Sequence, residues 1–459
     1  MMVAVPSDEI AHLSEPPMVK GLPLIGNTLE MAKDPAAFFA DCYRQYGEVF
    51  QIRIFGRTQP VIAGANAAIF MNTREGKECL RSKEFWEGLV QQYGGTRTLT
   101  GEDGDSHKEL RAIMKRGYSK KALEGHYPEM VEITDRAIKR RWQPGEKVPV
   151  VEAMQYMVVE QLGMLLTGEA PLDYVADIRR VILNILNVLV TRQRPGFMLW
   201  NPKYKASLAR MVELKDKMVE DYFRTRDTKS DQDKTLIDDI MEAHVNSPDV
   251  MPAQDLMITL TGPYVAGLDT VANTEAAFVY GVLKDPEIKA RIQAEVDAFF
   301  ADPREIDAER VLKELPCING AIMEAMRLYP IAVAQMRTAT RDFEFGGHLI
   351  KKDSLMFVAT SVPHFMEEYF PNPKKFDIDR YEKPRQEHLQ PGAYSPYGRG
   401  PHTCLGQSLA EVQMALGMAR LMYLVDMELE FPGYELKTKT APTPGPAMNF
   451  KIKVNGYRH

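Results

Sequence analysis

Alternation of apolar and polar positions appears early in the chain and again in its last third. It runs over residues 49–56, and a second short segment follows over residues 59–64; each of the two ends at a glycine. Two such runs so close together predict a hairpin of a small sheet. Similar patterns predict strands within residues 343–350 and a final hairpin over about residues 427–454.

Between about residues 105 and 300, apolar positions recur mostly at helical spacing. The longest helix is predicted from about Pro252, which stands where a first-turn proline belongs, to Lys284. Its length of about 45 Å would cross a whole domain, and because it is apolar on most faces we expect it to be buried. Pro263 removes one N–H from this helix, so we expect a distortion just before Ala266.

A second helix is predicted to begin at Leu405 and to present one apolar face to the core. Its apolar positions step by four and three: Leu405, Leu409, Val412, Leu416, Ala419 and Tyr423. Helices in the middle of the chain with strands toward its ends predict a mainly α fold with small β-sheets, of the α+β class. We find no repeat or linker, and the polar residues 224–234 are expected to form a surface loop. A single domain over residues 1–459 is therefore expected, with about residues 1–30 as an irregular N-terminal segment.

Composition narrows the class of protein. Acidic residues outnumber basic ones by 63 to 57, a net charge of −6, so the surface has no global preference for nucleic acid. The N-terminus lacks the apolar run of a signal peptide or membrane anchor, which predicts a soluble protein. The four cysteines stand far apart, so we expect neither a zinc site nor a disulfide scaffold, and a cytoplasmic location fits.

Glycine and proline are concentrated in residues 394–406. Three glycines and two prolines prevent regular structure up to Cys404, after which a helix is predicted at once. The sulfur would therefore lie near the positive end of a helix dipole, with backbone N–H groups nearby, and both favour the thiolate. A thiolate in such a loop is a good axial ligand for haem iron. A buried free cysteine at a tight turn is the alternative.

This segment resembles the haem-binding signature of the cytochrome P450 superfamily, F-x-x-G-x-R-x-C-x-G, in its soluble bacterial-type members. Gly400, Cys404 and Gly406 match, Tyr397 replaces the Phe, and His402 replaces an Arg that usually meets a haem propionate. The resemblance implies the single-domain cytochrome P450 fold, with haem b between the long helix and the cysteine loop and Cys404 as the iron ligand. It also implies cofactor contacts from Pro396, Tyr397, His402 and Gly406.

Other motifs follow in the family's order. Glu324 and Arg327 lie three apart on one helical face and resemble the E-x-x-R motif. The resemblance implies that Arg380, in a downstream loop, completes a buried network with this pair that is structural rather than catalytic. Propionate contacts are implied for three further side chains, Arg337, His107 and Arg111.

The pair Asp269-Thr270 follows Ala266-Gly267 in the middle of the long predicted helix. A charged Asp inside an apolar helix is costly unless it is solvated or paired, so an N-cap of a new helix or a surface position is the alternative. The segment resembles the family motif A-G-x-[D/E]-T, in which small residues let haem and dioxygen approach the helix. The resemblance implies that the Thr270 hydroxyl hydrogen-bonds dioxygen and that Asp269 relays protons, so that one oxygen atom leaves as water.

The resemblance implies a haem-dependent monooxygenase that inserts one oxygen atom of O2 into a lipophilic small molecule, terpenoid, steroid or fatty-acid-like. We expect a monomer that receives electrons from NAD(P)H through a separate ferredoxin or flavodoxin. A peroxide-driven peroxygenase is disfavoured because its family members characteristically lose the acid–Thr pair, and a non-catalytic haem sensor or carrier is the alternative from another class. Sterol 14-demethylases share a His at the place of His402 but characteristically carry His where Asp269 stands, so that reaction is not assigned.

Two surfaces complete the hypothesis. Mostly apolar segments are expected to line the substrate pocket: residues 85–99, 182–190, 264–265, 331–334 and 446–448. Basic side chains are concentrated in residues 107–121, where Glu109 is the acidic exception. If this segment is helical, Lys108, Arg111 and Lys115 share one side. Such a positive patch would steer an acidic electron donor toward the protein.

Overall fold

The structure is a computed structural model that describes residues 13–231 and 233–459. The chain forms two compact units, each assembled from segments far apart in sequence. The first unit comprises the described part of Met1–Phe85 together with Thr100–Asp103 and Met326–Cys404, and the second comprises Trp86–Leu99, Gly104–Ala325 and Leu405–His459. Because these segments alternate along the chain, no single position separates the units, and one domain over residues 1–459 stays a prediction.

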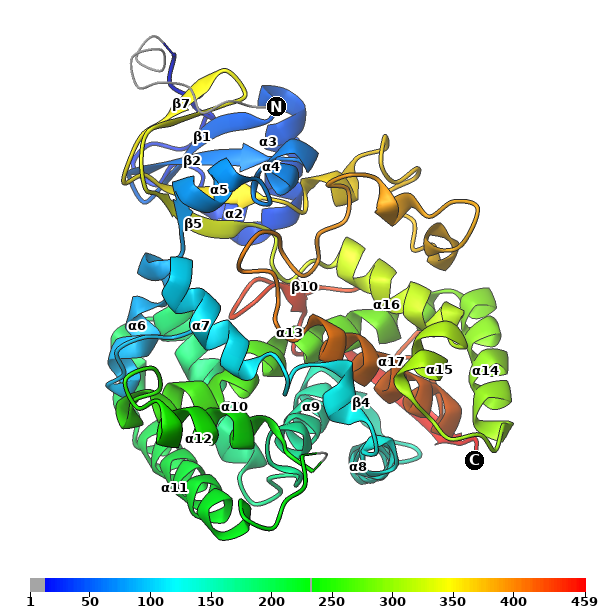
Figure 1. Ribbon diagram of the computed structural model, residues 1–459. Helices are drawn as coiled ribbons and strands as arrows, with labels where there is room; N and C mark the ends of the chain where they lie inside the picture. The colour runs from blue at the N-terminus through cyan, green and yellow to red at the C-terminus, as the bar shows by residue number, and fades with distance from the viewer. Residues whose placement is uncertain (1–12, 232) are drawn as a thin grey trace. The chain divides into compact units, whose positions relative to one another are not determined.

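A five-stranded sheet organises the first unit, in the strand order β1-β2-β8-β5-β3. Figure 1 labels β1, β2 and β5 of this sheet. The predicted early hairpin is confirmed, because β1 (Val49–Ile54) pairs antiparallel with β2 (Arg57–Ala63). β2 pairs parallel with β8 (Leu355–Ala359), and β8 pairs antiparallel with β5 (Gln335–Ala339). β3 (Leu80–Arg81) pairs antiparallel with the far side of β5.

This sheet packs on an apolar core that it shares with α3 (Pro35–Tyr46). Phe39, Phe50 and Val61 are buried there, because apolar side chains gain free energy on leaving water. The irregular N-terminal segment ends where α2 begins at Thr28, close to the predicted boundary, although residues 1–12 lie outside the described residues. The unit's other elements are α2 (Thr28–Lys33), α4 (Ala65–Phe70), α5 (Arg74–Cys79), the predicted pair β6 (Phe343–Phe345) and β7 (His348–Ile350), and 3₁₀ helices at Val362–Phe365, Ile378–Tyr381 and Glu387–Leu389.

The predicted long buried helix is α13 (Leu256–Lys284) of the second unit. It begins four residues later than predicted, because Pro252 is the N-cap of a separate 3₁₀ turn, Ala253–Asp255. Helical structure continues through Pro263, so the distortion expected there does not break the helix. α9 (Val150–Thr167) packs along α13, and the contact is close at Gly267, where a Cβ would lie 2.9 Å from the Leu162 side chain.

Two predictions about the helix after the cysteine loop are wrong. α17 (Gln407–Leu424) begins two residues later than Leu405, because Gly406 takes the N-cap position. It is also buried on most of its faces rather than on one. Met414, Gly417 and Met418 stand outside the predicted apolar steps, yet they too are buried, and helices that pack on α17 include α8 (Tyr127–Arg141), α14 (Pro286–Ala301) and α15 (Ala308–Lys313).

The predicted final hairpin is confirmed by β9 (Val425–Leu429) and β12 (Lys451–Tyr457), which pair antiparallel, and β4 (Lys147–Pro149) joins β12 on its other side. Between β9 and β12 the chain forms a smaller antiparallel hairpin of β10 (Thr438–Lys439) and β11 (Gly445–Pro446). A Cβ on Gly445 would lie 2.6 Å from Asn273 Cγ. The small hairpin is therefore packed tightly against the middle of α13.

The surface loop predicted over residues 224–234 begins within the last turn of α11 (Pro202–Thr225) and leads to α12 (Leu236–Asn246); residue 232 of this loop lies outside the described residues. Helices dominate the described chain and its sheets are small, which confirms the α+β class. Within the described residues, the helices are either too short or too polar to pass through a bilayer. The remaining elements are α6 (Lys83–Tyr93), α7 (Gly104–Met114), a 3₁₀ turn at Lys120–Leu123, α10 (Val175–Ile185), the π-helical turn η2 (Leu186–Val190), a 3₁₀ helix at Gly196–Trp200 and α16 (Pro316–Leu328).

Candidate functional site

The loop that precedes Cys404 is shaped by two glycines with positive φ. Gly398 has φ +73° and Gly400 has φ +79°, a region that side chains with a Cβ rarely adopt. A Cβ on Gly400 would lie 2.6 Å from the Met71 carbonyl oxygen, and the Gly400 N–H donates to Asn72 Oδ1 at 3.1 Å. Position 400 therefore requires glycine both for its backbone conformation and for its close approach to a neighbouring backbone.

Cys404 is the last residue of this loop. A hydrogen bond fixes its backbone, and the residue is exposed. Its N–H donates to the Tyr397 carbonyl oxygen at 2.9 Å, and α17 begins three residues later. A sulfur just before a helix N-terminus meets the partial positive charge that favours a thiolate. Cys42 and Cys79 are buried, and burial raises the pKa of the Cys42 thiol to about 12. The alternative of a buried free cysteine is therefore wrong for Cys404, and its exposed sulfur suits an iron ligand.

Arg337, on β5, is a buried cation whose hydrogen-bond acceptors are neutral. Its guanidinium donates to the Met336 carbonyl oxygen at 2.7 Å and to Gln335 Oε1 at 2.9 Å, and it forms no ion pair with a described residue. Burial lowers the pKa of Arg337 to about 10, although the negative charge of Asp103 acts in the opposite direction. Because a desolvated guanidinium is stabilised by an anion, Arg337 fits a propionate carboxylate.

His402 has a partner that the sequence did not indicate. Its Nε2 lies 2.9 Å from Asp103 Oδ1, and the Ser82 N–H donates to Asp103 Oδ2 at 2.9 Å. Burial raises the pKa of Asp103, but the hydrogen bonds from His402 and Ser82 outweigh this effect and hold that pKa below its usual value. His402 is thus fixed by a carboxylate of its own unit, and its contact with a propionate stays a prediction.

In the second unit, His107 and Arg111 lie one turn apart on α7, as predicted. His107 is buried and Arg111 is half-buried. One face of α7 therefore offers two nitrogen-bearing side chains, which is the arrangement expected of a pair that holds carboxylates.

The condition that residues 107–121 form one helix is not met. α7 ends at Met114, so Lys115 follows the helix, and Lys120 belongs to a separate 3₁₀ turn. Arg116 bonds to Asp239 Oδ1 at 2.7 Å and to the carbonyl oxygens of Lys234 and Thr235 before α12. These contacts give Arg116 structural partners within the second unit.

A narrow strip of α13 is uncovered while most of the helix is buried. Ala266 is exposed, and Gly262 and Thr270, one turn to either side, are partly exposed. The Thr270 hydroxyl donates to the Ala266 carbonyl oxygen at 2.7 Å. Because the residues at these four-residue steps are small, their side chains do not keep a flat group away from the helix backbone. This agrees with the predicted haem side of the helix.

Asp269 is fully buried beside this strip, and both of its carboxylate oxygens accept hydrogen bonds. Gln155 Nε2 of α9 donates to Oδ1 at 2.8 Å, and Thr443 Oγ1 donates to Oδ2 at 2.5 Å. Lys439 Nζ lies 3.3 Å from Oδ2. Because α13 continues on both sides and the side chain is covered, the N-cap and surface alternatives are wrong. Sequence reasoning missed these three partners, because they stand 114 to 174 positions from Asp269.

Arg327 and Arg380 of the predicted network meet at one backbone carbonyl oxygen, and Glu387 joins them as a further member. Arg327 and Arg380 are fully buried, and both donate to the Lys375 carbonyl oxygen, at 3.2 and 3.4 Å. Arg380 also forms an ion pair with Glu387 at 2.8 Å, which the sequence did not indicate, and Glu324 is fully buried one turn before Arg327. These contacts support the structural role predicted for the motif.

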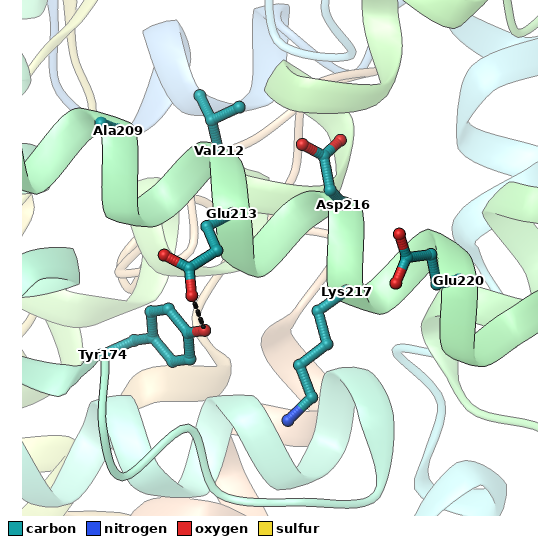
Figure 2. A pocket seen from close by; sticks show the side chains of 7 residues that line it. All are labelled: Tyr174, Ala209, Val212, Glu213, Asp216, Lys217 and Glu220. Atoms are coloured by element: carbon teal, nitrogen blue, oxygen red, sulfur yellow. Dashed lines mark hydrogen bonds between the residues drawn. The ribbon is translucent and has the colours of Figure 1, made fainter.

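A hollow on the surface of α11 is distinct from the predicted substrate pocket. Figure 2 shows its lining, where the Tyr174 hydroxyl donates to Glu213 Oε1 at 2.9 Å. Three carboxylates and a lysine line it together with three less polar side chains: Tyr174, Ala209, Val212, Glu213, Asp216, Lys217 and Glu220. It shares no residue with the predicted pocket, whose position stays a prediction.

Comparison with known proteins agrees with these features. A family model described as Cytochrome P450 matches residues 16–441. The chain is 25% identical over 421 residues to cyclooctat-9-en-7-ol 5-monooxygenase from Streptomyces melanosporofaciens, covering 87% of this chain and 86% of that one. It is 22% identical over 455 residues to taxane 10-beta-hydroxylase from Taxus cuspidata, covering 96% and 89%. The fold is similar to that of a retinoic acid bound cyanobacterial CYP120A1, with a TM-score of 0.80 at 24% identity, covering 97% of this chain and all of that chain, 100%.

The chain belongs to the cytochrome P450 family. It is a monooxygenase whose cofactor is haem.

Proposed function

We propose that this enzyme oxygenates a lipophilic small molecule, with terpenoids as the first class to test before steroids and fatty acids. The observation that carries the proposal is the position of Cys404, whose exposed sulfur ends a glycine loop just before α17. The substrate class is supported by the names of two relatives, which act on cyclooctat-9-en-7-ol and on a taxane.

The residues that would hold haem b fall into three groups, according to whether they would contact the iron, the propionates or the flat faces of the cofactor. The Cys404 thiolate would bind the iron, and Arg337, His402, His107 and Arg111 would neutralise the propionates. Contacts with the flat faces of the cofactor would come from small or loop residues: Pro396, Tyr397, Gly406, Ala266 and Gly267. When bound, the haem supplies the iron that activates O2.

Asp269 and Thr270 would control protons at the open strip of α13. The Thr270 hydroxyl donates to the Ala266 carbonyl oxygen, and by rotation it can donate to a ligand instead. The Asp269 carboxylate is held by three donors, so it is positioned to accept a proton and to pass it to its neighbour. Burial of Asp269 excludes bulk water from this exchange.

The substrate would lie against the apolar segments named above. Within the second unit, Ile182 and Tyr264 are fully buried and Val265 is nearly so. The segment of residues 182–190 ends in the π-helical turn η2, a distortion that is frequent at functional sites. An apolar lining with few polar groups suits a lipophilic molecule.

Electrons would come from NAD(P)H through a separate ferredoxin or flavodoxin. The basic segment after α7 supports this, because Lys115 and Lys121 are exposed. Lys108 and Arg116 are already paired, with Asp105 and Asp239, so they contribute less to docking. The remaining positive charge would raise the association rate with an acidic partner.

The test of the iron ligand is the Cys404→Ala variant, with Cys317→Ala as the matched control. We expect Cys404→Ala to lose the strongly red-shifted carbon monoxide band of the reduced protein, and Cys317→Ala to keep it. A Cys404→Ala protein that retains the band would show that another residue binds the iron. Terpenoids, steroids and fatty acids are then screened for a shift of the Soret band and for NADPH-dependent product with a ferredoxin system. Ligands that bind without any product would favour a haem sensor or carrier.

A further inference from the structure

The hairpin of β10 and β11 is connected to Asp269 by two side chains. Lys439 Nζ, on β10, lies 3.3 Å from Asp269 Oδ2 and donates to the Thr443 carbonyl oxygen at 3.2 Å. Thr443 Oγ1, in the turn of the hairpin, donates to the same Oδ2 at 2.5 Å and accepts from Asn273 Nδ2 at 3.1 Å. The carboxylate of α13 is therefore bound on one side by residues of a C-terminal hairpin.

Burial makes this ion pair costly. The Asp269 side chain is 0% exposed and the Lys439 side chain is 13% exposed. Burial lowers the pKa of Lys439, while the charge of Asp269 acts in the opposite direction. Because two charges lose their hydration here, the pair contributes little net stability, and its value is better sought in function.

The two branches of the network differ in what they can transfer. On the Oδ1 side, Gln155 contacts Asp269, and its Oε1 accepts from Arg179 Nε at 2.7 Å. A primary amide and a guanidinium hold their protons at neutral pH, so this branch orients the carboxylate. On the Oδ2 side, Lys439 is a titratable cation that reaches the solvent boundary.

We infer that Lys439 is a positioning residue that supplies protons from solvent to Asp269, which rests on the proposed role of Asp269 as the acid beside Thr270. One Nζ–H bond breaks as the proton moves to Asp269 Oδ2, and the Nζ lone pair then takes a proton from water. No electrons are exchanged, and the net change is one proton moved from solvent to the carboxylate. Thr443 keeps Oδ2 in place while this proton moves.

The test compares Lys439→Arg and Lys439→Met, with Lys437→Met as the control at an exposed lysine two residues away. Arginine keeps the charge and the hydrogen bonds to Asp269 but does not release a proton. We expect both Lys439 variants to bind haem and substrate normally, to turn over at least about 10-fold more slowly and to show a larger solvent isotope effect. Normal turnover in Lys439→Arg would overturn proton supply and leave only a role in holding Asp269.

A second measurement does not depend on activity. In a double-mutant cycle, Lys439→Met should lower the unfolding midpoint strongly in the wild type, because it leaves Asp269 buried without its cation, and only weakly in an Asp269→Asn background. Lys437→Met should have the same small effect in both backgrounds. Additive effects of Lys439→Met and Asp269→Asn would overturn the pairing itself. If Asp269→Asn turns over normally while the carbon monoxide band is intact, the proposed acid role fails, and the inference about Lys439 fails with it.

Discussion

His402 Nε2 lies 2.9 Å from Asp103 Oδ1, although 299 positions separate the two residues. The Ser82 N–H fixes the other oxygen of the same carboxylate, and the positive charge of Arg337 also acts on Asp103. One carboxylate is thereby connected to two of the residues that are proposed to meet the propionates. Asp103 fixes the loop two residues before the proposed iron ligand.

Replacing Asp103 should loosen the cofactor. In Asp103→Ala, His402 loses its carboxylate partner, so we expect haem to transfer to an excess of a haem-binding apoprotein several times faster than from the wild type. Asp105→Ala is the control, because Asp105 is exposed and pairs with Lys108 at the surface. Equal rates of haem loss in the two variants would show that the contact with His402 does not hold the loop.

Gly400→Ala should destabilise the protein more than the same change at another glycine with positive φ. Gly433→Ala is the matched control, because Gly433 has φ +78° and nothing lies within 4 Å of a Cβ there. Both variants carry the cost of the left-handed conformation, but Gly400→Ala also clashes with the Met71 carbonyl oxygen. We expect a difference of about 1–3 kcal/mol in unfolding free energy and a lower haem content in Gly400→Ala. Equal stabilities would mean that the loop can move away from that carbonyl group.

Glu275 should make stability depend on pH. This carboxyl group is fully buried on α13, neither of its oxygens has a hydrogen-bond partner in the described structure, and burial raises its pKa well above the usual value. The free energy that protonated Glu275 contributes to folding is fully present below the pKa of this group in the unfolded chain. It is lost as pH rises from that value through the higher pKa of the folded protein. The stability of Glu275→Gln relative to the wild type should therefore grow with pH, by up to about 1.4 kcal/mol per pH unit.

Urea unfolding at several pH values from 4.5 upward measures this difference. Glu129→Gln is the control, because Glu129 is exposed on α8. A difference between Glu275→Gln and the wild type that stays constant with pH would show that Glu275 is ionised in the folded protein.

The acid and the alcohol on α13 should affect different parts of turnover. Thr270→Ala should divert reducing equivalents to peroxide, whereas Asp269→Asn should slow turnover by about 100-fold because proton delivery fails. Both variants should keep haem and bind substrate. Product and peroxide formed per NADPH are measured, with Thr274→Ala as the control, since its hydroxyl also donates to the carbonyl group four residues back. Wild-type yields and rates in both variants would rule out these roles.

The basic segment after α7 should control reduction by an acidic partner. Reversing Lys115 and Lys120 to Glu should slow the reduction of the haem by a ferredoxin or flavodoxin, most at low ionic strength, where screening is weak. Lys203 and Lys205 on α11 provide a control with the same change of charge. Substrate binding should be unchanged in both proteins. If the two double variants are reduced at the same rate, docking does not use this segment.

The sequence by itself determined the elements that depend on short-range rules. The hairpin of β1 and β2, the long helix α13 and the irregular loop up to Cys404 follow from alternation, helical spacing and the backbone limits of glycine and proline. These rules act between residues close together in the chain, so they can be recognised in the sequence without knowing any tertiary contact. The spacing of Gly400, Cys404 and Gly406 is also local, and its resemblance to the family signature led to Cys404 as the proposed iron ligand.

The tertiary structure decided what depends on contacts between distant segments. α7 ends at Met114 and Arg116 binds Asp239 of α12, while α17 is buried on faces that its apolar spacing did not mark. The partners of Asp269 and His402 come from positions more than 100 residues away, and their side chains carry no local signal. The sequence shows that Asp269 carries a carboxylate, but it does not show that Lys439 and Gln155 bind it. Only the packing of the folded chain brings these residues together.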